Sequence, residues 1–466
     1  MSDVKDRSHV PPQPDFDQDR IVEFMLDPDT HDGASVEHIE THISHVFLAG
    51  EHAYKMKKAV VLPFVDFSSK TARLKACHGE IEVNRRTAPD IYLDVLTISA
   101  FEGSLSLGGP GEPVDFVVRM RRFRQDCLLD RIAAEHRLTP PLVHGIADQV
   151  AALHLAADRH LPGTLSEDFE KTATDLLRRL NDTDCSDVTR ARLHVLEKLI
   201  LGALHDQIPE IRARARHGAV RHGHGDLHLG NLCVFNESIR LFDAIEFEPR
   251  FSHIDVLYDI AFVTMDLLHR ACNAEAITML SRYLSATRDY AGVDNLRLFM
   301  AVRAGVRALV ALLANASGRE AQAQEFIELA IDILDRPRTR RLIAVGGRSG
   351  TGKSTLALSL APVLATAPDV IVLRADELRK RMFDTPPEDP LPASAYSDSV
   401  TTQVYRRLFR DAARTVRNGD PRRLVPRVTE PIGIPGAGTQ TWCSRDRPLA
   451  VRTHRGAGQP LVSASA

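Results

Sequence analysis

Residues 224–231 read His-Gly-Asp-Leu-His-Leu-Gly-Asn, so Asp226 and Asn231 stand five positions apart, and Asp243 follows Asn231 by twelve positions. Transfer of a γ-phosphoryl group depends on a carboxylate that orients the acceptor hydroxyl and on oxygen ligands for magnesium. Asp226 is therefore the candidate catalytic carboxylate. Asn231 and Asp243 supply the hard oxygen atoms that Mg²⁺ prefers beside the phosphates of ATP.

A β-hairpin is predicted directly after Asn231. The apolar run at residues 232–235 and the segment at residues 239–242 flank a polar turn at residues 236–238, which is typical of two strands joined by a tight turn. Such a hairpin would return Asp243 towards Asn231. The alternative interpretation is an exposed polar turn without a chemical role.

Histidines gather around the same loop, and imidazole is a common zinc ligand. They are His217, His222, His224 and His228. A closed zinc site needs four ligands, but the loop contains no Cys and the chain contains no CxxC pair. We therefore expect His224 to orient the loop by hydrogen bonds rather than to bind zinc.

Two strands are predicted upstream, at residues 42–50 and 52–60. The second carries Lys55 and Lys57 on one face, because strand side chains alternate. One of these lysines is expected to meet the nucleotide phosphates. The alternative is a short charged run at a solvated strand end.

A polar, helix-compatible segment follows at residues 69–86 and offers Glu80 and Glu82. Kinases pair the phosphate-binding lysine of a strand with a glutamate of a helix. We predict that Lys55 pairs with Glu80.

The rest of this small sheet is expected at residues 91–99 and 114–120, with a Gly-Gly-Pro-Gly turn at residues 108–111 between them. Residues 120–123 would then form the hinge beside the adenine ring. No GxGxxG pattern lies near the first strands, so another hairpin loop must cover the phosphates.

A second nucleotide signature lies downstream. Residues 347–354 read Gly-Arg-Ser-Gly-Thr-Gly-Lys-Ser and match the P-loop pattern Gly-x-x-x-x-Gly-Lys-Ser/Thr. An apolar run at residues 342–345 fits the preceding strand, and residues 355–365 fit the following helix. The candidate phosphate and magnesium contacts are Gly347, Gly350, Gly352, Lys353, Ser354 and Thr355, with Ser354 as the magnesium ligand.

Another strand is predicted at residues 370–373, before the charged segment 374–381. In that segment Asp376 is either an acceptor-side carboxylate or the N-cap of a helix. Beyond residue 420 no apolar run is long enough for a central strand. The further strands and the Walker B carboxylate of a whole P-loop kinase are not visible there, which indicates a truncated domain.

The loop at residues 224–231 resembles the catalytic loop of the aminoglycoside phosphotransferase-like kinases, in which a His-Gly-Asp-Leu-His core replaces the His-Arg-Asp of protein kinases. Residues 255–261 are similar to the Asp-containing helix that supports this loop in that family. Residues 147–154 resemble its helix that ends in Leu-His. The resemblance implies an α+β bilobal protein-kinase-like domain over residues 20–335.

Residues 374–381 resemble the acceptor-side segment of small, gluconate-kinase-like P-loop kinases. The whole chain looks like a bacterial fusion of an aminoglycoside phosphotransferase-like domain with a predicted P-loop kinase. This implies an incomplete α/β P-loop NTPase-type domain at residues 341–420 and an irregular or disordered tail at residues 421–466.

Composition and charge argue against two classes of partner, nucleic acids and membranes. The net charge is −3, so no basic surface favours nucleic acid, and no long apolar or basic amphipathic segment favours a membrane. The six Cys are scattered singly, which suits a reducing compartment. We expect a cytoplasmic protein.

The combined motifs predict an ATP- and magnesium-dependent phosphotransferase that acts on a hydroxyl group of a small molecule and carries a second ATP-binding site. The alternative is an ATP-binding regulatory or sensor protein that does not transfer phosphate. The sequence identifies neither the acceptor nor the oligomeric state.

Overall fold

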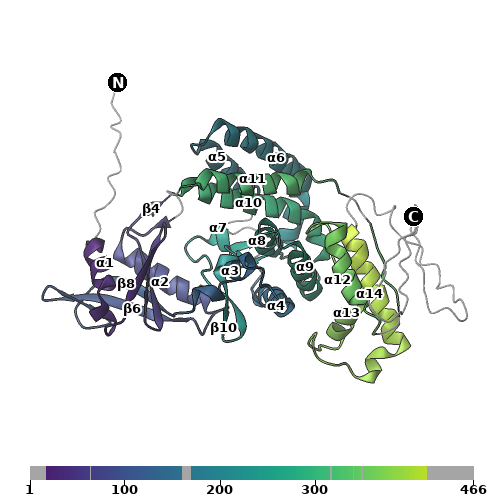
Figure 1. Ribbon diagram of the computed structural model, residues 1–466, viewed down its shortest axis with the longest axis horizontal. Helices are drawn as coiled ribbons and strands as arrows, with labels where there is room; N and C mark the ends of the chain where they lie inside the picture. The colour runs from purple at the N-terminus through teal and green to yellow at the C-terminus, as the bar shows by residue number, and fades with distance from the viewer. Residues whose placement is uncertain are drawn as a thin grey trace, which may run out of the picture. The chain divides into compact units, whose positions relative to one another are not determined.

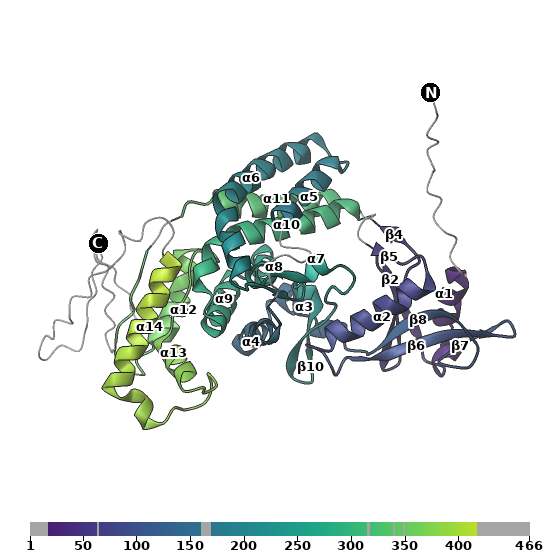
Figure 2. The same ribbon diagram turned by 180° about the vertical axis from the view of Figure 1, so that it is seen from behind.

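The computed structural model describes residues 17–62, 65–159, 169–314, 317–338, 341–347 and 350–416. The predicted tail at residues 421–466 lies outside this part. The chain packs as two compact units (Figures 1 and 2). The first comprises residues 1–138, 152–169 and 212–259, and the second comprises residues 139–151, 170–211 and 260–466. This division by packing differs from the predicted domain division, which stays a prediction.

A six-stranded antiparallel sheet forms the framework of the first unit, drawn in purple and blue in Figure 1. Four strands were predicted, whereas the two edge strands β1 and β7 were not. In sheet order the strands are β1 (Val36–Glu40), β2 (Ser44–Ala49), β3 (His52–Lys57), β8 (Glu112–Arg121), β6 (Tyr92–Phe101) and β7 (Ser104–Leu107).

Two helices cover opposite faces of this sheet. Ile21 and Met25 of α1 (Gln18–Leu26) pack against one face in a cluster with Met56. The other face receives the predicted helix α2 (Lys70–Asn84), which begins after its N-cap Ser69. Because strand side chains alternate, Lys55 and Lys57 point away from the α1 side, where Tyr54 and Met56 are buried.

The first unit also contains short elements outside the six-stranded sheet. They are η1 (Pro28–His31), β4 (Val61–Leu62), β5 (Val65–Asp66), η2 (Gln125–Cys127), α3 (Leu129–Ala134), β9 (Val220–His222), η3 (Leu229–Asn231), β10 (Leu232–Phe235), β11 (Ser238–Leu241), α7 (Pro249–Ser252) and β12 (His253–Asp255). Strands β10 and β11 pair antiparallel, so the predicted hairpin is confirmed. Its turn residues Asn236 and Glu237 both have positive φ, which a two-residue turn of this kind requires.

The described part of the second unit is helical. Its helices, some of which also reach into the residues of the first unit, are α4 (Pro140–Ala156), α5 (Phe169–Asp182), α6 (Asp187–Arg216), α8 (Val256–His269), α9 (Asn273–Thr287), η4 (Tyr290–Asn295), α10 (Leu296–Leu313), α11 (Arg319–Asp335), α12 (Lys353–Leu364), α13 (Ala375–Met382), η5 (Ala393–Tyr396) and α14 (Asp398–Val416). None of the helices in the described ranges is both long and apolar enough to cross a membrane.

The strands predicted at residues 342–345 and 370–373 are wrong, because neither run is in a β-ladder. An apolar run becomes a strand only when neighbouring strands accept its backbone hydrogen bonds, and the described residues of this unit supply helices instead. The predicted helix after the P-loop does form, as α12. Helix α13 begins after Arg374, so Asp376 lies in its first turn and is not its N-cap.

Candidate active site

Lys55 and Glu80 form the predicted ion pair. The Lys55 Nζ atom of β3 lies 2.8 Å from Glu80 Oε1 of α2, and the carboxylate of Glu80 is buried. Lys55 also makes an ion pair with Asp243, the residue that follows the hairpin. Burial disfavours the charged lysine, but Asp243 and Glu80 outweigh this and raise the Lys55 pKa well above its usual value. Lys55 is thus a permanent cation in contact with two carboxylates.

The loop at residues 224–231 brings Asp226 and Asn231 together. The Nδ2 atom of Asn231 donates to the Asp226 carbonyl oxygen and to its Oδ2 atom, each at 2.9 Å. These bonds close the segment of residues 226–231 and leave Oδ1 of Asn231 as the amide atom that could hold a cation. The side chain of Asp226 is 39% exposed, so a substrate hydroxyl can reach its carboxylate.

The hairpin returns Asp243 to this loop, as predicted. The backbone N–H of Phe242 donates to the Asn231 carbonyl oxygen at 3.0 Å, and the N–H of Asp243 donates to the Tyr92 hydroxyl at 3.0 Å. Asp243 has a φ of 61°, a left-handed conformation that these contacts hold in place. Its side chain is 44% exposed, which leaves the carboxylate open to a ligand.

The carboxylate of Asp259 holds the loop at residues 224–231 in place. One of its carboxylate oxygens accepts the backbone N–H of His224 at 2.6 Å, and the other accepts that of Gly225 at 3.1 Å. The His154 ring lies 3.1 Å from the same carboxylate. This is the support that the resemblance of residues 255–261 implied, whereas the contact with His154 was not predicted. Gly225 is required here, because its φ is 86° and a Cβ atom would lie 2.5 Å from the Phe251 carbonyl oxygen.

A strand lysine paired with a helix glutamate, a loop aspartate with its asparagine, and a hairpin aspartate beside the lysine are the parts of a kinase site. All parts of this kinase-like site belong to the first unit.

The side chains of the loop histidines contact different partners and do not converge on one point. His224 is buried, which lowers its pKa, and its Nε2 atom lies 3.0 Å from the Phe242 carbonyl oxygen. His222 stacks on His253 with ring centroids 4.6 Å apart. Within the described ranges, no three His, Cys, Asp or Glu side chains are grouped so that they could hold a metal ion.

A second set of charges in the kinase-like site was not predicted from the sequence. Lys57 lies 2.6 Å from Glu80 Oε2 and 2.5 Å from Glu246 Oε1. The shared strand face of Lys55 and Lys57 was visible in the sequence, but nothing local linked either lysine to Glu246. The one available signal was its position three residues after Asp243.

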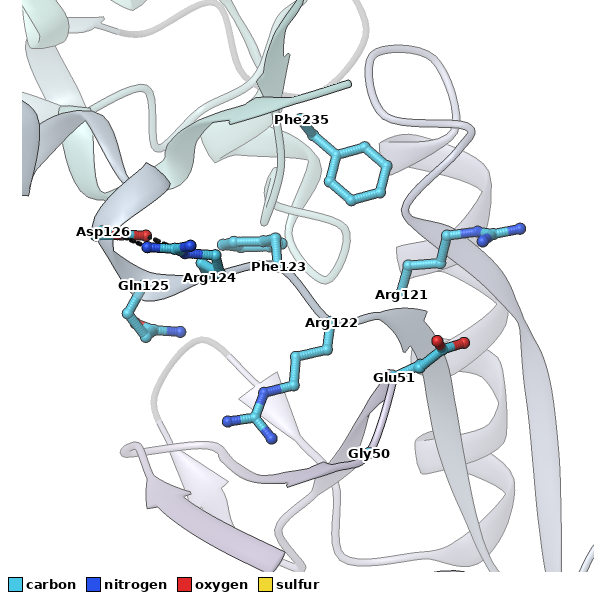
Figure 3. Close-up of a pocket in the computed structure, with 9 residues that line it drawn as sticks. All are labelled: Gly50, Glu51, Arg121, Arg122, Phe123, Arg124, Gln125, Asp126 and Phe235. Atoms are coloured by element: carbon cyan, nitrogen blue, oxygen red, sulfur yellow. Dashed lines mark hydrogen bonds and ion pairs between the residues drawn. The ribbon is translucent and has the colours of Figure 1, made fainter. Parts of the chain in front are cut away.

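A cavity of about 650 Å³ opens beside the end of β8 (Figure 3). Its lining includes three of the four residues predicted as the hinge, Arg121, Arg122 and Phe123. Figure 3 shows the rings of Phe123 and Phe235 at this cavity and the ion pair of Arg124 with Asp126. Gly50, Glu51 and Gln125 complete the lining.

The P-loop has the local geometry that its glycines predict. Gly347, Gly350 and Gly352 all have positive φ, at 152°, 76° and 83°. Gly352 is the N-cap of α12, so Lys353, Ser354 and Thr355 form the first turn of that helix. Arg348 and Ser349 lie outside the described residues. A helix N-terminus after such a loop presents backbone N–H groups to an anion.

Residues 342–425 match the family model of the AAA domain. An uncharacterized protein of Mycobacterium tuberculosis is 28% identical over 393 residues, which cover 82% of this chain and 76% of that protein. An uncharacterized protein of Mycobacterium bovis matches equally.

Three solved structures are similar at low identity. A choline/ethanolamine kinase family protein from Mesorhizobium loti has a TM-score of 0.41 at 13% identity and covers 68% of this chain and 98% of its own. A thermostable mutant of the aminoglycoside phosphotransferase APH(4)-Ia has a TM-score of 0.42 at 17% identity, with coverage of 66% and 98%. Choline kinase from Cryptosporidium parvum has a TM-score of 0.43 at 13% identity, with coverage of 68% and 95%.

Proposed function

We propose that the first unit is an ATP- and magnesium-dependent phosphotransferase that moves the γ-phosphoryl group of ATP to a hydroxyl of a small molecule. The observation that carries this proposal is the convergence of Lys55, Glu80 and Asp243, which come from a strand, a helix and a hairpin. A domain that only binds nucleotide does not need an exposed carboxylate such as that of Asp226 beside these three residues.

Asp226 takes the role of general base in this proposal. Its carboxylate is exposed enough to accept the proton of an acceptor hydroxyl, and Asn231 fixes its position through two hydrogen bonds. A positioned carboxylate of this kind typically contributes about 10² to 10⁴ in rate. Lys55 would bind the phosphates, with Glu80 fixing the lysine side chain.

Asn231 and Asp243 would hold magnesium. The residues fit this ion because the amide oxygen of Asn231 and the open carboxylate of Asp243 are hard oxygen donors, and magnesium in nucleotide sites takes few protein ligands beside phosphates and water. When bound, the ion would neutralise the charge that develops on the phosphates.

The adenine ring is assigned to the cavity beside residues 121–123. A volume of about 650 Å³ is in the range of small-molecule sites, and the rings of Phe123 and Phe235 give it apolar walls. From there the phosphates would extend towards Lys55.

The P-loop would be a second ATP site, with Gly347, Gly350 and Gly352 shaping the loop, Lys353 and Thr355 contacting phosphates, and Ser354 holding magnesium. The AAA domain match and the start of α12 at Lys353 support nucleotide binding. The strand before this loop does not form, which favours a second candidate function for this site: sensing of nucleotide without turnover.

The acceptor can be found by incubating the protein with ATP, magnesium and a bacterial metabolite extract. We expect mass spectrometry to find a metabolite that gains a phosphate with the wild-type protein and not with Asp226→Asn. Bound ATP without any Asp226-dependent product would contradict the proposal and leave the alternative, a nucleotide sensor.

A further inference from the structure

Glu80 is shared between two lysines. Its Oε1 atom lies 2.8 Å from Lys55 Nζ, and its Oε2 atom lies 2.6 Å from Lys57 Nζ. The kinase arrangement accounts for one lysine at this glutamate. Lys57 is therefore an additional cation with no assigned role.

Lys57 connects Glu80 to Glu246 in the protein interior. The side chains of Lys57, Glu80 and Glu246 are 1%, 0% and 4% exposed, and Lys57 Nζ lies 2.5 Å from Glu246 Oε1. Lys57 also sits over the ring of Phe67, 5.6 Å from its centroid. A buried charge without a partner destabilises the folded protein. Each of these three side chains therefore depends on its buried partners.

Glu246 belongs to the segment of residues 244–247, which directly follows Asp243. Each residue of this segment contacts another part of the first unit. The N–H of Ala244 donates to Asn84 Oδ1 of α2 at 2.8 Å, and the N–H of Ile245 donates to the His224 carbonyl oxygen at 3.0 Å. After Glu246, the ring of Phe247 packs edge-on against Phe67. The segment thus ties the catalytic loop to α2 and β3.

We propose that Lys57 and Glu246 are positioning residues that hold Glu80 in place when Asp243 is drawn away from Lys55 by the metal and the nucleotide. This inference rests on the proposed function. Lys55 divides its charge between Glu80 and Asp243 in the structure. Once Asp243 binds the metal, Glu80 is the carboxylate that keeps Lys55 against the phosphates. Glu80 is held by Lys57, which is held in turn by Glu246, so Glu80 does not move with Lys55.

A consequence for regulation follows. In protein kinases, control acts on whether the lysine–glutamate pair is assembled. Here the segment after Asp243 keeps the glutamate in its working position through buried contacts. The kinase-like site is therefore assembled before any activating event.

A test compares two matched double substitutions in a Lys353→Ala background, which removes turnover at the P-loop. One is Lys57→Met with Glu246→Leu, which replaces the buried pair by apolar groups of similar size. The control is Lys58→Met with Glu40→Leu, which removes the neighbouring but exposed ion pair of Lys58 and Glu40. The assay is ADP formation from Mg-ATP without an added acceptor.

The buried double variant is expected to lose about tenfold or more in kcat, with KM for ATP changed by less than about threefold, whereas the control stays within about twofold. The discriminating readout is a cycle with Lys55→Met. Because Lys57 and Glu246 act through Lys55, their replacement should have no further effect once Lys55 is absent. A purely structural role would lower activity equally in both backgrounds.

Thermal unfolding of each variant is measured alongside. If the buried double variant does not fold, Glu246→Gln takes its place, since the amide still accepts from Lys57, and a smaller kcat loss that vanishes with Lys55→Met is expected. An unchanged kcat, or a loss that persists with Lys55→Met, overturns the inference and leaves the proposed function intact. ADP formation that does not depend on Asp226 overturns the proposed function and the inference with it.

Discussion

The two nucleotide motifs of this chain are built in opposite ways. In the kinase-like site, Lys55, Glu80 and Asp243 come from separate elements and meet through two ion pairs, of which the pair of Lys55 with Glu80 is buried. In the P-loop, Gly347, Gly350 and Gly352 shape one short loop by their own backbone conformations. The first therefore depends on the packing of distant elements, and the second on local backbone freedom. Changes to remote side chains and changes to single glycines should separate the two.

The largest effect is expected from Asp259→Ala. This substitution leaves the buried N–H groups of His224 and Gly225 without an acceptor, and each unpaired group costs about 1–3 kcal/mol. We expect the free energy of unfolding to fall by about 3 kcal/mol, measured by urea denaturation, with loss of Asp226-dependent ADP formation. Asp94→Ala is the control, because Asp94 pairs with Arg119 at the surface and its loss should cost less than about 1 kcal/mol. Equal losses for both variants would contradict the account.

A smaller effect, confined to the P-loop, is expected from Gly352→Ala. A Cβ atom there meets nothing within 4 Å, but the φ of 83° is strained for alanine by about 1–2 kcal/mol. We expect roughly tenfold weaker binding of a fluorescent ATP analogue in a Lys55→Met background, which removes the lysine that is proposed to bind the phosphates in the kinase-like site. Gly202→Ala provides the matched control, since its surroundings are equally open and it lies within α6 with an ordinary φ. The idea fails if both alanines change binding alike.

The smallest effect is the pH dependence that His222 gives the kinase-like unit. Burial, together with the charges of Arg86 and His253, lowers its pKa from 6.5 to about 4. The unfolded chain therefore binds a proton below about pH 6.5 that the folded chain refuses until about pH 4. Stability should fall across this window as the pH falls, by about 1 kcal/mol after allowance for the partly exposed ring. Urea midpoints of His222→Asn should vary less with pH between 6.5 and 4 than those of the wild type, and an identical slope would refute the assignment.

Patterns that are local in the sequence predicted much of the kinase-like site. The spacing of Asp226 and Asn231 and the hairpin signal at residues 232–242 were enough to place Asp243 beside the loop. Strand alternation and a helix-compatible segment, combined with the lysine–glutamate pairing of kinases, predicted that Lys55 pairs with Glu80. The roles of these residues in catalysis and in metal binding stay predictions.

Other features depend on long-range packing that no local pattern reveals. Glu246 meets Lys57 across 189 positions of sequence, so its partner could not be read from its neighbours. The run at residues 342–345 has the composition of a buried strand, yet no described strand of the second unit is there to pair with it. Motif spacing thus predicted the P-loop turn and α12 correctly, whereas the strands predicted at residues 342–345 and 370–373 do not form.

The most direct test of the central claim measures ADP formation from Mg-ATP by four proteins: wild type, Asp226→Asn, Lys353→Ala and the double variant. We predict that Asp226→Asn lowers kcat by about 10² to 10⁴ and that Lys353→Ala leaves most of the activity in place. The result that would contradict the account is the reverse, in which Lys353→Ala abolishes ADP formation and Asp226→Asn leaves it unchanged.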